Sequence, residues 1–273
     1  MASIPAILEI PPPEVAELWR QVLKPTFMIG GWLWILSYVL LARENMRSKS
    51  YGMPLFALAN NLAWELIYAF YFHDVWFKRL VFTIWVCLEI PIVFGTIRNS
   101  KYEWSHTPIV HEHFGKILLA LTLWCAVGHW SFLHWWFEWN ISAKKGKFYR
   151  GVEGPDPTEL KWWSGEFCQM TLSLTSLVQL ITRQHTRGVT WAIWATRAIG
   201  SSFEPHFHAL FAWLYWREPH EFLASPVSIF LSGTAVICDL VYPFVFAHIR
   251  RRERNSSSNS GAKDKNGSTK KLR

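Results

Sequence analysis

Apolar residues recur along the chain in seven runs, each near the length that a lipid bilayer requires. A helix needs about 20 mostly apolar residues to cross about 30 Å of hydrocarbon. Trp and Tyr residues gather near the ends of several runs, as amphipathic rings do at a membrane interface. The pattern predicts an all-α polytopic membrane protein, with a seven-transmembrane-helix bundle over residues 25–248. The predicted spans are Pro25–Ala42, Gly52–Phe72, Leu80–Ile97, Ile117–Phe137, Trp162–Ile181, Val189–Trp216 and Ser225–His248.

The segments that flank these runs have a different composition. Residues 1–24 are interrupted by Pro11–Pro13, and we expect an N-terminal interfacial cap with a short helix over Glu14–Leu23. The net charge is +8, but residues 250–273 alone hold nine basic and two acidic residues. This polar end has no apolar face to pack, so residues 249–273 are predicted to be a disordered basic tail in the cytosol. A nucleic-acid-binding domain would carry its charge on a folded face, so no nucleic acid partner is expected.

Positive charges in the loops assign the two sides of the membrane. Cytosolic loops carry an excess of Lys and Arg, and such residues follow the first, third, fifth and seventh runs. We therefore predict a cytosolic C-terminus and a lumenal N-terminus, in the membrane of the endoplasmic reticulum. A basic cluster between Ser142 and Lys161 lies on the opposite side and conflicts with this orientation. The supporting residues are Arg43, Arg47, Lys49, Arg98, Lys101, Arg183, Arg187, Arg250, Arg251, Arg252 and Arg254.

Ionisable residues inside the predicted spans are the first candidates for function. Each costs about 2.5–3.5 kcal/mol on insertion scales. Glu89 precedes Pro91, where a structural role is sufficient. Arg197 and Glu204 lie seven residues apart on one helix face, and we expect Arg197 to pair with a carboxylate or to line a substrate pocket. A purely structural ion pair explains Arg197 equally well. The full set is Glu65, Glu89, Glu166, Arg197, Glu204 and Asp239.

Glu65 and Asp239 are the strongest candidates for catalysis, because they lie mid-span without a cation on their own helices. Asn61 lies one turn before Glu65 and Tyr68 three residues after it, so both can orient the carboxyl group. Tyr242 stands in the same relation to Asp239. Desolvation favours the neutral form of a buried carboxylic acid, and a neutral acid can donate a proton at physiological pH. These residues predict one shared acidic cavity, although two helix-bridging hydrogen bonds would use the same side chains.

Pro243 separates the roles of the two acids. It has no N–H, so the carbonyl of Asp239 loses its helical partner and the helix should kink there. We therefore expect Asp239 to shape or support the site, and Glu65 to be the direct proton donor.

Other catalytic motifs are weak or absent. Glu204, His206 and His208, and the triplet 111–113, lack the i, i+4 histidine pair of zinc hydrolases. The sequence has no DDxxD motif for magnesium-bound diphosphate, no DxDD motif and no nucleotide-binding glycine loop. We expect neither a metal nor a cofactor. The four cysteines all fall within the predicted spans and are most simply small buried hydrophobes.

Seven short stretches carry a resemblance to a known family. They are Tyr51-Gly52-Met53-Pro54, the run from Asn60 to Glu65, the run from Glu103 to Pro108, the run from Gln179 to Arg183, Thr186-Arg187-Gly188, Trp194 to Arg197 with Gly200-Ser201, and Asp239. In this order and spacing they resemble the fungal integral-membrane terpene cyclases of meroterpenoid and indole-diterpene (paxilline-type) biosynthesis. The resemblance covers most of residues 25–250. The longer N-terminus, the stretch Asn140–Lys161 and the polar tail depart from the family and bear on the substrate more than on the fold.

The resemblance implies an enzyme that cyclises a prenylated aromatic or polyketide-derived substrate within the membrane. The substrate, with a farnesyl or geranylgeranyl chain from a pathway prenyltransferase, usually carries a terminal epoxide made by a flavin monooxygenase. Glu65 and Asp239 are then the catalytic acids, and a protonated carboxyl opens the epoxide so that the alkenes close rings in a cationic cascade. Aromatic faces can stabilise the passing cation. The implied substrate-contacting or cation-stabilising residues are Asn61, Trp64, Tyr68, Trp194, Arg197 and Tyr242.

Two other classes of protein share parts of this pattern. A seven-helix receptor or transporter would explain the spans without chemistry, but the loops are short and no duplicated halves are visible. A membrane isomerase of sterol-like alkenes would also need a buried acid and aromatic cation stabilisers. The substrate, an open prenyl epoxide or a preformed ring system, separates that enzyme from a cyclase.

Glycosylation tests the predicted orientation. Asn140-Ile141-Ser142 is an acceptor pattern in the predicted lumenal loop, whereas Asn255 and Asn266 match the pattern in the predicted cytosolic tail. We expect Asn140 alone to be able to receive a glycan in microsomes, so Asn255→Gln and Asn266→Gln should leave the electrophoretic mobility unchanged. A glycan on either tail residue would reverse the orientation.

Overall fold

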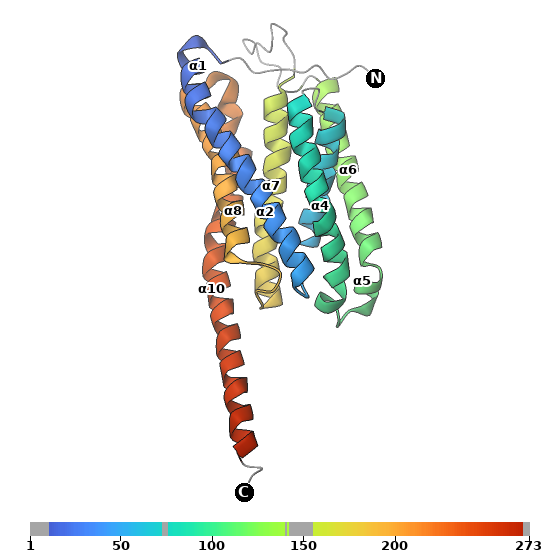
Figure 1. Cartoon of the computed structure of the whole chain (residues 1–273). Coiled ribbons are helices and arrows are strands. Elements are labelled where there is room, and N and C mark those ends of the chain that lie inside the picture. Colours follow the sequence, from blue (N-terminus) through green and yellow to red (C-terminus); the bar gives the residue numbers. More distant parts are fainter. Residues whose placement is uncertain (1–10, 73–75, 140, 142–154, 270–273) are drawn as a thin grey trace.

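The computed structural model describes residues 11–72, 76–139, 141 and 155–269, and all regular structure in this part of the chain is helical. The all-α class predicted from the sequence is therefore confirmed. Figure 1 shows long helices packed side by side, with α10 leaving the bundle at the end opposite α1. The elements are α1 (Pro13–Leu18), η1 (Trp19–Leu23), α2 (Lys24–Arg47), α3 (Leu55–Ile67), η2 (Tyr68–Phe72), α4 (Trp76–Glu103), α5 (Pro108–Glu112), α6 (Phe114–Glu138), α7 (Pro157–Arg183), α8 (Trp191–Ser201), η3 (Ser202–Phe207), α9 (His208–Tyr215), η4 (Glu218–Ala224) and α10 (Pro226–Thr269).

Four helical stretches of the described chain are long and apolar enough to cross a membrane. The first begins at Pro13, because α1, η1 and α2 follow one another without a break, so the expected cap is continuous with the first span. The helices over the second, fifth and sixth predicted spans do not reach the same combination of length and apolarity, and a count of seven crossings stays a prediction. The four stretches are Pro13–Arg47, Arg79–Glu103, Phe114–Glu138 and Pro226–Ser256.

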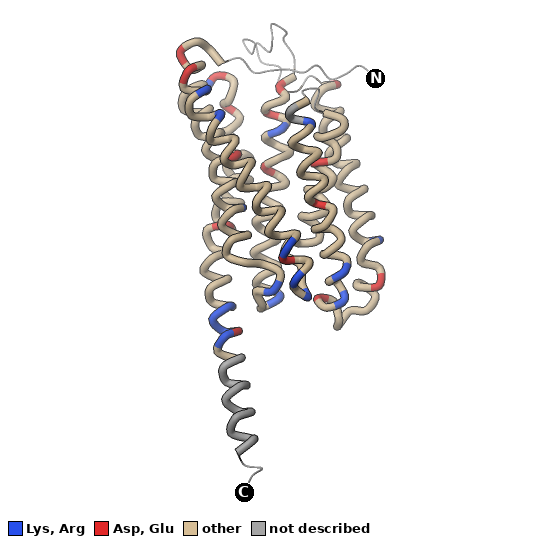
Figure 2. Tube along the Cα trace, in the orientation of Figure 1, with Lys and Arg blue, Asp and Glu red and all other residues tan. Residues whose placement is uncertain are grey.

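The distribution of side chains is that of a membrane bundle. Large apolar side chains such as Trp32, Trp124 and Phe244 are 65–76% exposed on the outer surface. Carboxyl groups such as Glu65 and Glu89 are instead buried inside the bundle. Lipid accepts the apolar side chains, whereas polar groups at membrane depth turn toward the bundle interior. Figure 2 shows most of the described Lys and Arg residues near the helix ends, many of them where α10 leaves the bundle.

The sixth predicted span is a broken helix rather than one straight element. α8 ends at Ser201, and the backbone of Glu204 is non-helical, with φ −131° and ψ 118°. Pro205 follows it, and proline disfavours the helical conformation in the preceding residue. Arg197 and Glu204 were expected on one helix face, but this break separates them.

The last element, α10, runs as a helix from Pro226 to Thr269. No proline follows Pro243 to stop the helix, and helix propagation costs less than nucleation. The division of the chain into cap, membrane domain and disordered tail stays a prediction.

α2 crosses the junction of α8 and η3 at very short range, and two glycines make this possible. A Cβ atom on Gly30 would lie 2.7 Å from the Cβ of Glu204 and 3.0 Å from the carbonyl oxygen of Gly200. Gly200 in turn packs its backbone against Trp34 and Leu33 of α2. This crossing fixes the position of α8 against α2, and therefore the distance between the side chains that both helices present to the interior.

Gly30→Ala is expected to lower the amount of folded protein in membranes, because overpacking at such a crossing costs about 1–3 kcal/mol. Gly128→Ala on α6 is the control, since a Cβ at that position meets nothing within 4 Å. Membrane abundance and the aggregation midpoint in detergent measure the effect. If Gly30→Ala matches Gly128→Ala in both, the helices do not depend on this close approach.

Candidate active site

Glu65 is the centre of a buried polar cluster built from α2, α3 and α4. The hydroxyl of Tyr38 donates a hydrogen bond of 2.6 Å to Oε1 of Glu65. The amide nitrogen of Asn61 donates to Oε1 of Glu65 and to Oε1 of Glu89, each at 2.9 Å, and also contacts the Tyr38 hydroxyl. Glu65 and Glu89 are 1% and 0% exposed. Neither carboxyl has an ion-pair partner among the described residues. We call these four residues the Glu65 cluster.

Asp239 lies in a second cluster, which joins α7, α8 and α10. Nη2 of Arg197 donates to Oδ1 of Asp239 at 2.5 Å, so the carboxylate has a permanent cation as its partner. Ser173 donates to Oδ2 at 2.9 Å, and Gln169 reaches the same oxygen at 3.5 Å. Nη1 of Arg197 donates to the hydroxyl of Ser176 at 2.9 Å. Arg197 and Asp239 thus form a buried ion pair whose lone pairs are largely satisfied, which is the condition under which such a pair is tolerated.

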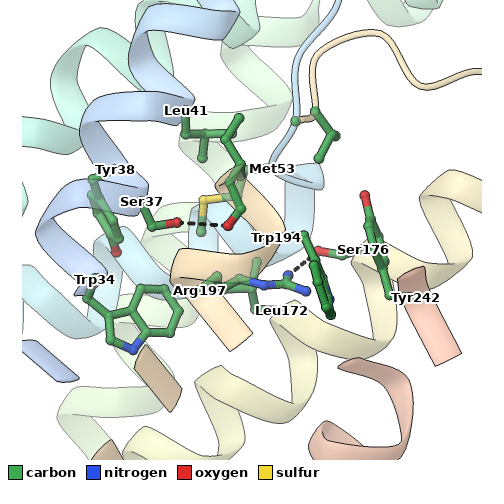
Figure 3. Close-up of a pocket in the computed structure, with 13 residues that line it drawn as sticks. Trp34, Ser37, Tyr38, Leu41, Met53, Leu172, Ser176, Trp194, Arg197 and Tyr242 are labelled. Carbon is green, nitrogen blue, oxygen red and sulfur yellow. Dashed lines mark hydrogen bonds between the residues drawn. The ribbon is translucent and has the colours of Figure 1, made fainter. Parts of the chain in front are cut away.

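A small cavity separates the two clusters. Its volume of about 30 Å³ is enough for roughly one water molecule. Tyr38 and Arg197 both line it, whereas Glu65 and Asp239 do not, so each acid lies one hydrogen bond behind the cavity wall. Figure 3 shows side chains from α2, α7, α8 and α10 around this space. The lining residues are Trp34, Ser37, Tyr38, Leu41, Gly52, Met53, Leu172, Ser176, Val189, Ile193, Trp194, Arg197 and Tyr242.

Three of the residues singled out in the sequence meet at this cavity: Trp194, Arg197 and Tyr242. Arg197 has a carboxylate partner, as expected, and it lines this cavity. Its expected role toward a substrate stays a prediction. Trp194 has a second contact, because its indole N–H donates to the backbone carbonyl of Asp239 at 3.1 Å. Pro243 deprives this carbonyl of its helical donor. The indole N–H of Trp194 therefore replaces the backbone donor that this carbonyl of α10 lacks.

Trp64 and Tyr68 lie elsewhere in the bundle. The indole N–H of Trp64 donates to Ser164 of α7 at 3.0 Å, and the Tyr68 hydroxyl lies 2.6 Å from the same oxygen. Their rings pack together against Phe82. Tyr68 was expected to orient Glu65, but its hydroxyl meets Ser164. The hydroxyl that donates to Glu65 is that of Tyr38 from α2.

Two residues of the Glu65 cluster escaped the sequence analysis. Glu89 was set aside because Pro91 offered a structural reason for it, yet its carboxyl shares the Asn61 amide with Glu65. Tyr38 was passed over within an apolar run. The available signal was the pair Ser37-Tyr38, the two consecutive hydroxyl side chains in the middle of the first span. Only the fold, in which the Tyr38 side chain of α2 reaches Glu65 of α3, assigns Tyr38 to Glu65.

The remaining buried acids belong to other contacts. Oε1 of Glu166 lies 3.6 Å from Nε2 of His206, and Ser232 of α10 donates to its other oxygen at 3.0 Å. This contact links η3 to α7 and α10, away from the cavity lining. Asn140, the predicted glycosylation site, lies outside the described residues.

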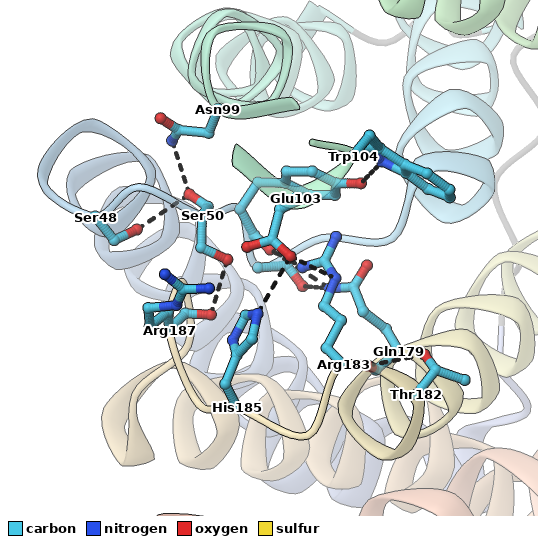
Figure 4. Close-up of polar contacts among 12 residues, drawn as sticks. Ser48, Ser50, Asn99, Glu103, Trp104, Gln179, Thr182, Arg183, His185 and Arg187 are labelled. Atoms are coloured by element: carbon cyan, nitrogen blue, oxygen red, sulfur yellow. Dashed lines mark hydrogen bonds and ion pairs between the residues drawn. The ribbon is translucent and has the colours of Figure 1, made fainter. Parts of the chain in front are cut away.

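The loop motifs of the sequence form a polar network at the end of the bundle below the cavity (Figure 4). Glu103 pairs with Arg183 and His185 at 3.3 Å each. Arg183 also donates to the carbonyl of Tyr51 at 2.8 Å and lies 4.1 Å from the centre of its ring. Trp104 donates to the Tyr51 hydroxyl at 3.0 Å. Because Gly52 and Met53 follow Tyr51 and line the cavity, this network holds the cavity floor in place.

Comparison with known proteins identifies the family. Residues 7–252 match the Pyr4-like transmembrane terpene cyclases. The chain is 39% identical over 247 residues to the terpene cyclase ascF of Acremonium egyptiacum, which covers 90% of this chain and 89% of the relative. It is 33% identical over 238 residues to the Pyr4-family terpene cyclase mfmH of Annulohypoxylon moriforme (86% and 90%) and 32% identical over 250 residues to the terpene cyclase idtB of Claviceps paspali (91% and 95%). No solved structure matches the chain.

The chain therefore belongs to the Pyr4-like transmembrane terpene cyclases. It is a membrane-bound terpene cyclase of secondary-metabolite biosynthesis. This membership decides against a receptor or transporter and favours a cyclase over a sterol-type isomerase.

The Arg197–Asp239 pair predicts a specific pattern of stability. Asp239→Asn and Arg197→Leu should each reduce membrane abundance, because removing one partner of a buried pair costs about 3–5 kcal/mol. The double variant Arg197→Leu/Asp239→Leu should recover abundance, since apolar pairs often replace buried ion pairs without loss. Immunoblots of membranes at matched expression measure this. If Arg197→Leu alone keeps full abundance and full activity, the Arg197–Asp239 pair contributes neither to stability nor to the reaction.

Proposed function

We propose that this cyclase opens the terminal epoxide of a prenylated aromatic or polyketide-derived substrate, with Glu65 as the source of the proton, and closes rings by a cationic cascade. The observation that carries the proposal is the contrast between the two acids. Glu65 has hydrogen-bond partners but no cation among the described residues. Asp239 already has Arg197 at 2.5 Å. A carboxyl without a cation in a dry interior holds its proton, whereas one beside a guanidinium gives it up.

The reaction balances without a co-reactant. The proton passes to the epoxide oxygen, the bond from that oxygen to the more substituted carbon breaks, and the nearest alkene attacks the resulting cation. Further alkenes continue the cascade until the last cation loses a proton or is trapped by an oxygen of the substrate. The proton lost at the end equals the proton supplied at the beginning. In the variant of this chemistry that starts from an alkene, the same acid protonates a carbon.

The cavity wall supplies the environment that such cations need. Trp34, Trp194 and Tyr242 line it, and an aromatic face stabilises a desolvated cation by about 2 kcal/mol or more. The wall is mostly apolar, which keeps out the water that would quench the cascade. Because the cavity has room for only about one water, substrate binding requires the surrounding side chains to move apart.

Asp239 has a supporting role in this proposal. An uncompensated guanidinium beside the cavity would repel the carbocation, and the Asp239 carboxylate neutralises it at 2.5 Å. Nε of Arg197 is buried and has no hydrogen-bond partner among the described residues. It is available to a carbonyl or phenol oxygen of the substrate's non-prenyl part, which would fix the orientation of the chain.

We further propose seven membrane crossings, with the N-terminus in the lumen of the endoplasmic reticulum and the C-terminus in the cytosol. The basic residues near the exit of α10 support this orientation under the positive-inside rule. The prenyltransferase and the flavin monooxygenase that prepare the substrate are functional partners in this proposal.

Glu65→Gln tests the proposed proton source. The amide keeps the size of the side chain and much of its hydrogen bonding but has no acidic proton. We expect normal membrane abundance and a loss of epoxide consumption of at least about 10²–10⁴-fold, the usual contribution of general acid catalysis. Glu112→Gln, an exposed position on α5, is the control and should be fully active. The assay feeds epoxidised farnesyl and geranylgeranyl aromatic compounds to yeast microsomes at matched enzyme abundance. Wild-type turnover by Glu65→Gln would remove the case for Glu65 as the acid.

A further inference from the structure

We infer that the hydroxyl of Tyr38, and not the carboxyl of Glu65 itself, hands the proton to the substrate. The inference rests on the proposed function and assigns the group that meets the reacting atoms. Tyr38 lines the cavity, whereas Glu65 does not. The two are joined by a hydrogen bond of 2.6 Å, short enough for a proton to pass between the oxygens. Glu65 thus reaches the cavity through Tyr38.

The position of Tyr38 is well determined by its neighbours. Its side chain is 5% exposed and packs edge-on against Trp34, with the ring centres 6.1 Å apart. The hydroxyl also contacts the Asn61 amide. Figure 3 shows Tyr38 beside Ser37 and Trp34 at the α2 side of the cavity, with Arg197 coming from α8. The only proton-donating side chains of the lining besides the Trp rings and Arg197 are Tyr38, Ser37, Ser176 and Tyr242, and of these Tyr38 alone has a carboxyl partner.

The step can be written as a relay of two protons. In the structure the Tyr38 hydroxyl donates to Oε1 of Glu65. When an epoxide oxygen accepts the Tyr38 proton instead, this hydrogen bond reverses and the protonated Glu65 carboxyl donates to the Tyr38 oxygen. The O–H bond of Tyr38 breaks as its proton forms a new O–H bond with the epoxide oxygen. At the same time the carboxyl O–H of Glu65 breaks and its proton restores the hydroxyl of Tyr38. The epoxide C–O bond opens, Tyr38 is unchanged, and Glu65 is left as a carboxylate. The proton that the final cation releases returns the carboxylate to its starting state, so no other reactant is needed.

The relay explains why a phenol can serve as the acid. Tyr38 alone would be left as a phenolate in a dry cavity, which desolvation disfavours. With Glu65 behind it, the negative charge appears on the carboxylate, where Asn61 already donates a hydrogen bond at 2.9 Å. The charge is also set back from the carbocation by one side chain, which reduces the chance that the two recombine.

Tyr38→Phe is the first test. It removes one oxygen and keeps the ring in the cavity wall, so we expect normal abundance and a loss of epoxide opening of at least about 10²-fold. Tyr71→Phe is the matched control, because its hydroxyl also has a side-chain partner, the half-buried His134 at 3.0 Å, but Tyr71 does not line the cavity. Tyr71→Phe should retain wild-type turnover. Wild-type turnover by Tyr38→Phe, with Glu65→Gln inactive, would overturn the relay while leaving Glu65 as the acid.

Fluorinated tyrosines at position 38 separate proton transfer from mere orientation of Glu65. Amber suppression in yeast can install 3-fluorotyrosine and 3,5-difluorotyrosine, which keep the hydroxyl and change its acidity. If Tyr38 transfers the proton, the rate of epoxide opening changes progressively with the acidity of the phenol and shows a solvent deuterium isotope effect. A rate that is independent of fluorination, with Tyr38→Phe inactive, would make Tyr38 a positioning residue only. Normal turnover by both Tyr38→Phe and Glu65→Gln would instead remove the proposed function itself.

Discussion

An unpaired carboxyl or guanidinium is costly inside a membrane, and the interior of this protein is arranged around that cost. Arg197 and Asp239 offset it by pairing with each other, and the residues that complete the pair come from α7. The pair therefore ties α7, α8 and α10 together at mid-depth. Glu65 and Glu89 have no cation within the described part of the chain, and they share the amide of Asn61, which ties α3 to α4. These polar contacts join the helices in addition to the apolar clusters that are buried between them.

The same constraint gives the two acids opposite chemical character. A carboxylate beside a guanidinium is stable as an anion, and a carboxyl that is fully buried beside a second carboxyl and away from any cation of the described chain is favoured as an acid. Both arise from one kind of residue in one bundle, through partners that belong to other helices. The cavity lies between the environments of the two acids, and its wall includes Tyr38 on the side of Glu65 and Arg197 on the side of Asp239. In the proposed function, a substrate bound there lies between the Tyr38 hydroxyl and the Arg197 guanidinium.

The sequence is informative where the signal lies within one segment. The apolar runs predicted the positions of the long helices, and the depth of Glu65 and Asp239 drew attention to both acids. Arg197 could be predicted to need a carboxylate, because an isolated guanidinium is unstable in lipid. The identity of that carboxylate could not be predicted, since α8 and α10 meet only in the fold. Tyr38 was missed for the same reason. Tyr68 was chosen in its place because it lies within one helical turn of Glu65 in the sequence, although its hydroxyl meets Ser164 of α7 in the fold.

The break in the sixth span shows a further limit. Pro205 was visible in the sequence and accounts for the non-helical backbone of the preceding Glu204. The close approach of Gly30 on α2 to this break follows only from the fold.

The hydrogen bond from Trp194 to the Asp239 carbonyl has a consequence for how product scope can diversify. A cavity residue that makes only apolar contacts, such as Leu41, Leu172 or Ile193, can be exchanged for an apolar residue of similar volume at a cost below about 1.5 kcal/mol. Trp194 cannot, because its loss would leave a buried carbonyl of α10 without a donor. Mutational drift and laboratory evolution should therefore reshape the aliphatic part of the wall and leave the Trp194 side fixed. New ring patterns would then arise from changes in the aliphatic side chains of the cavity wall, while Trp194 keeps its place.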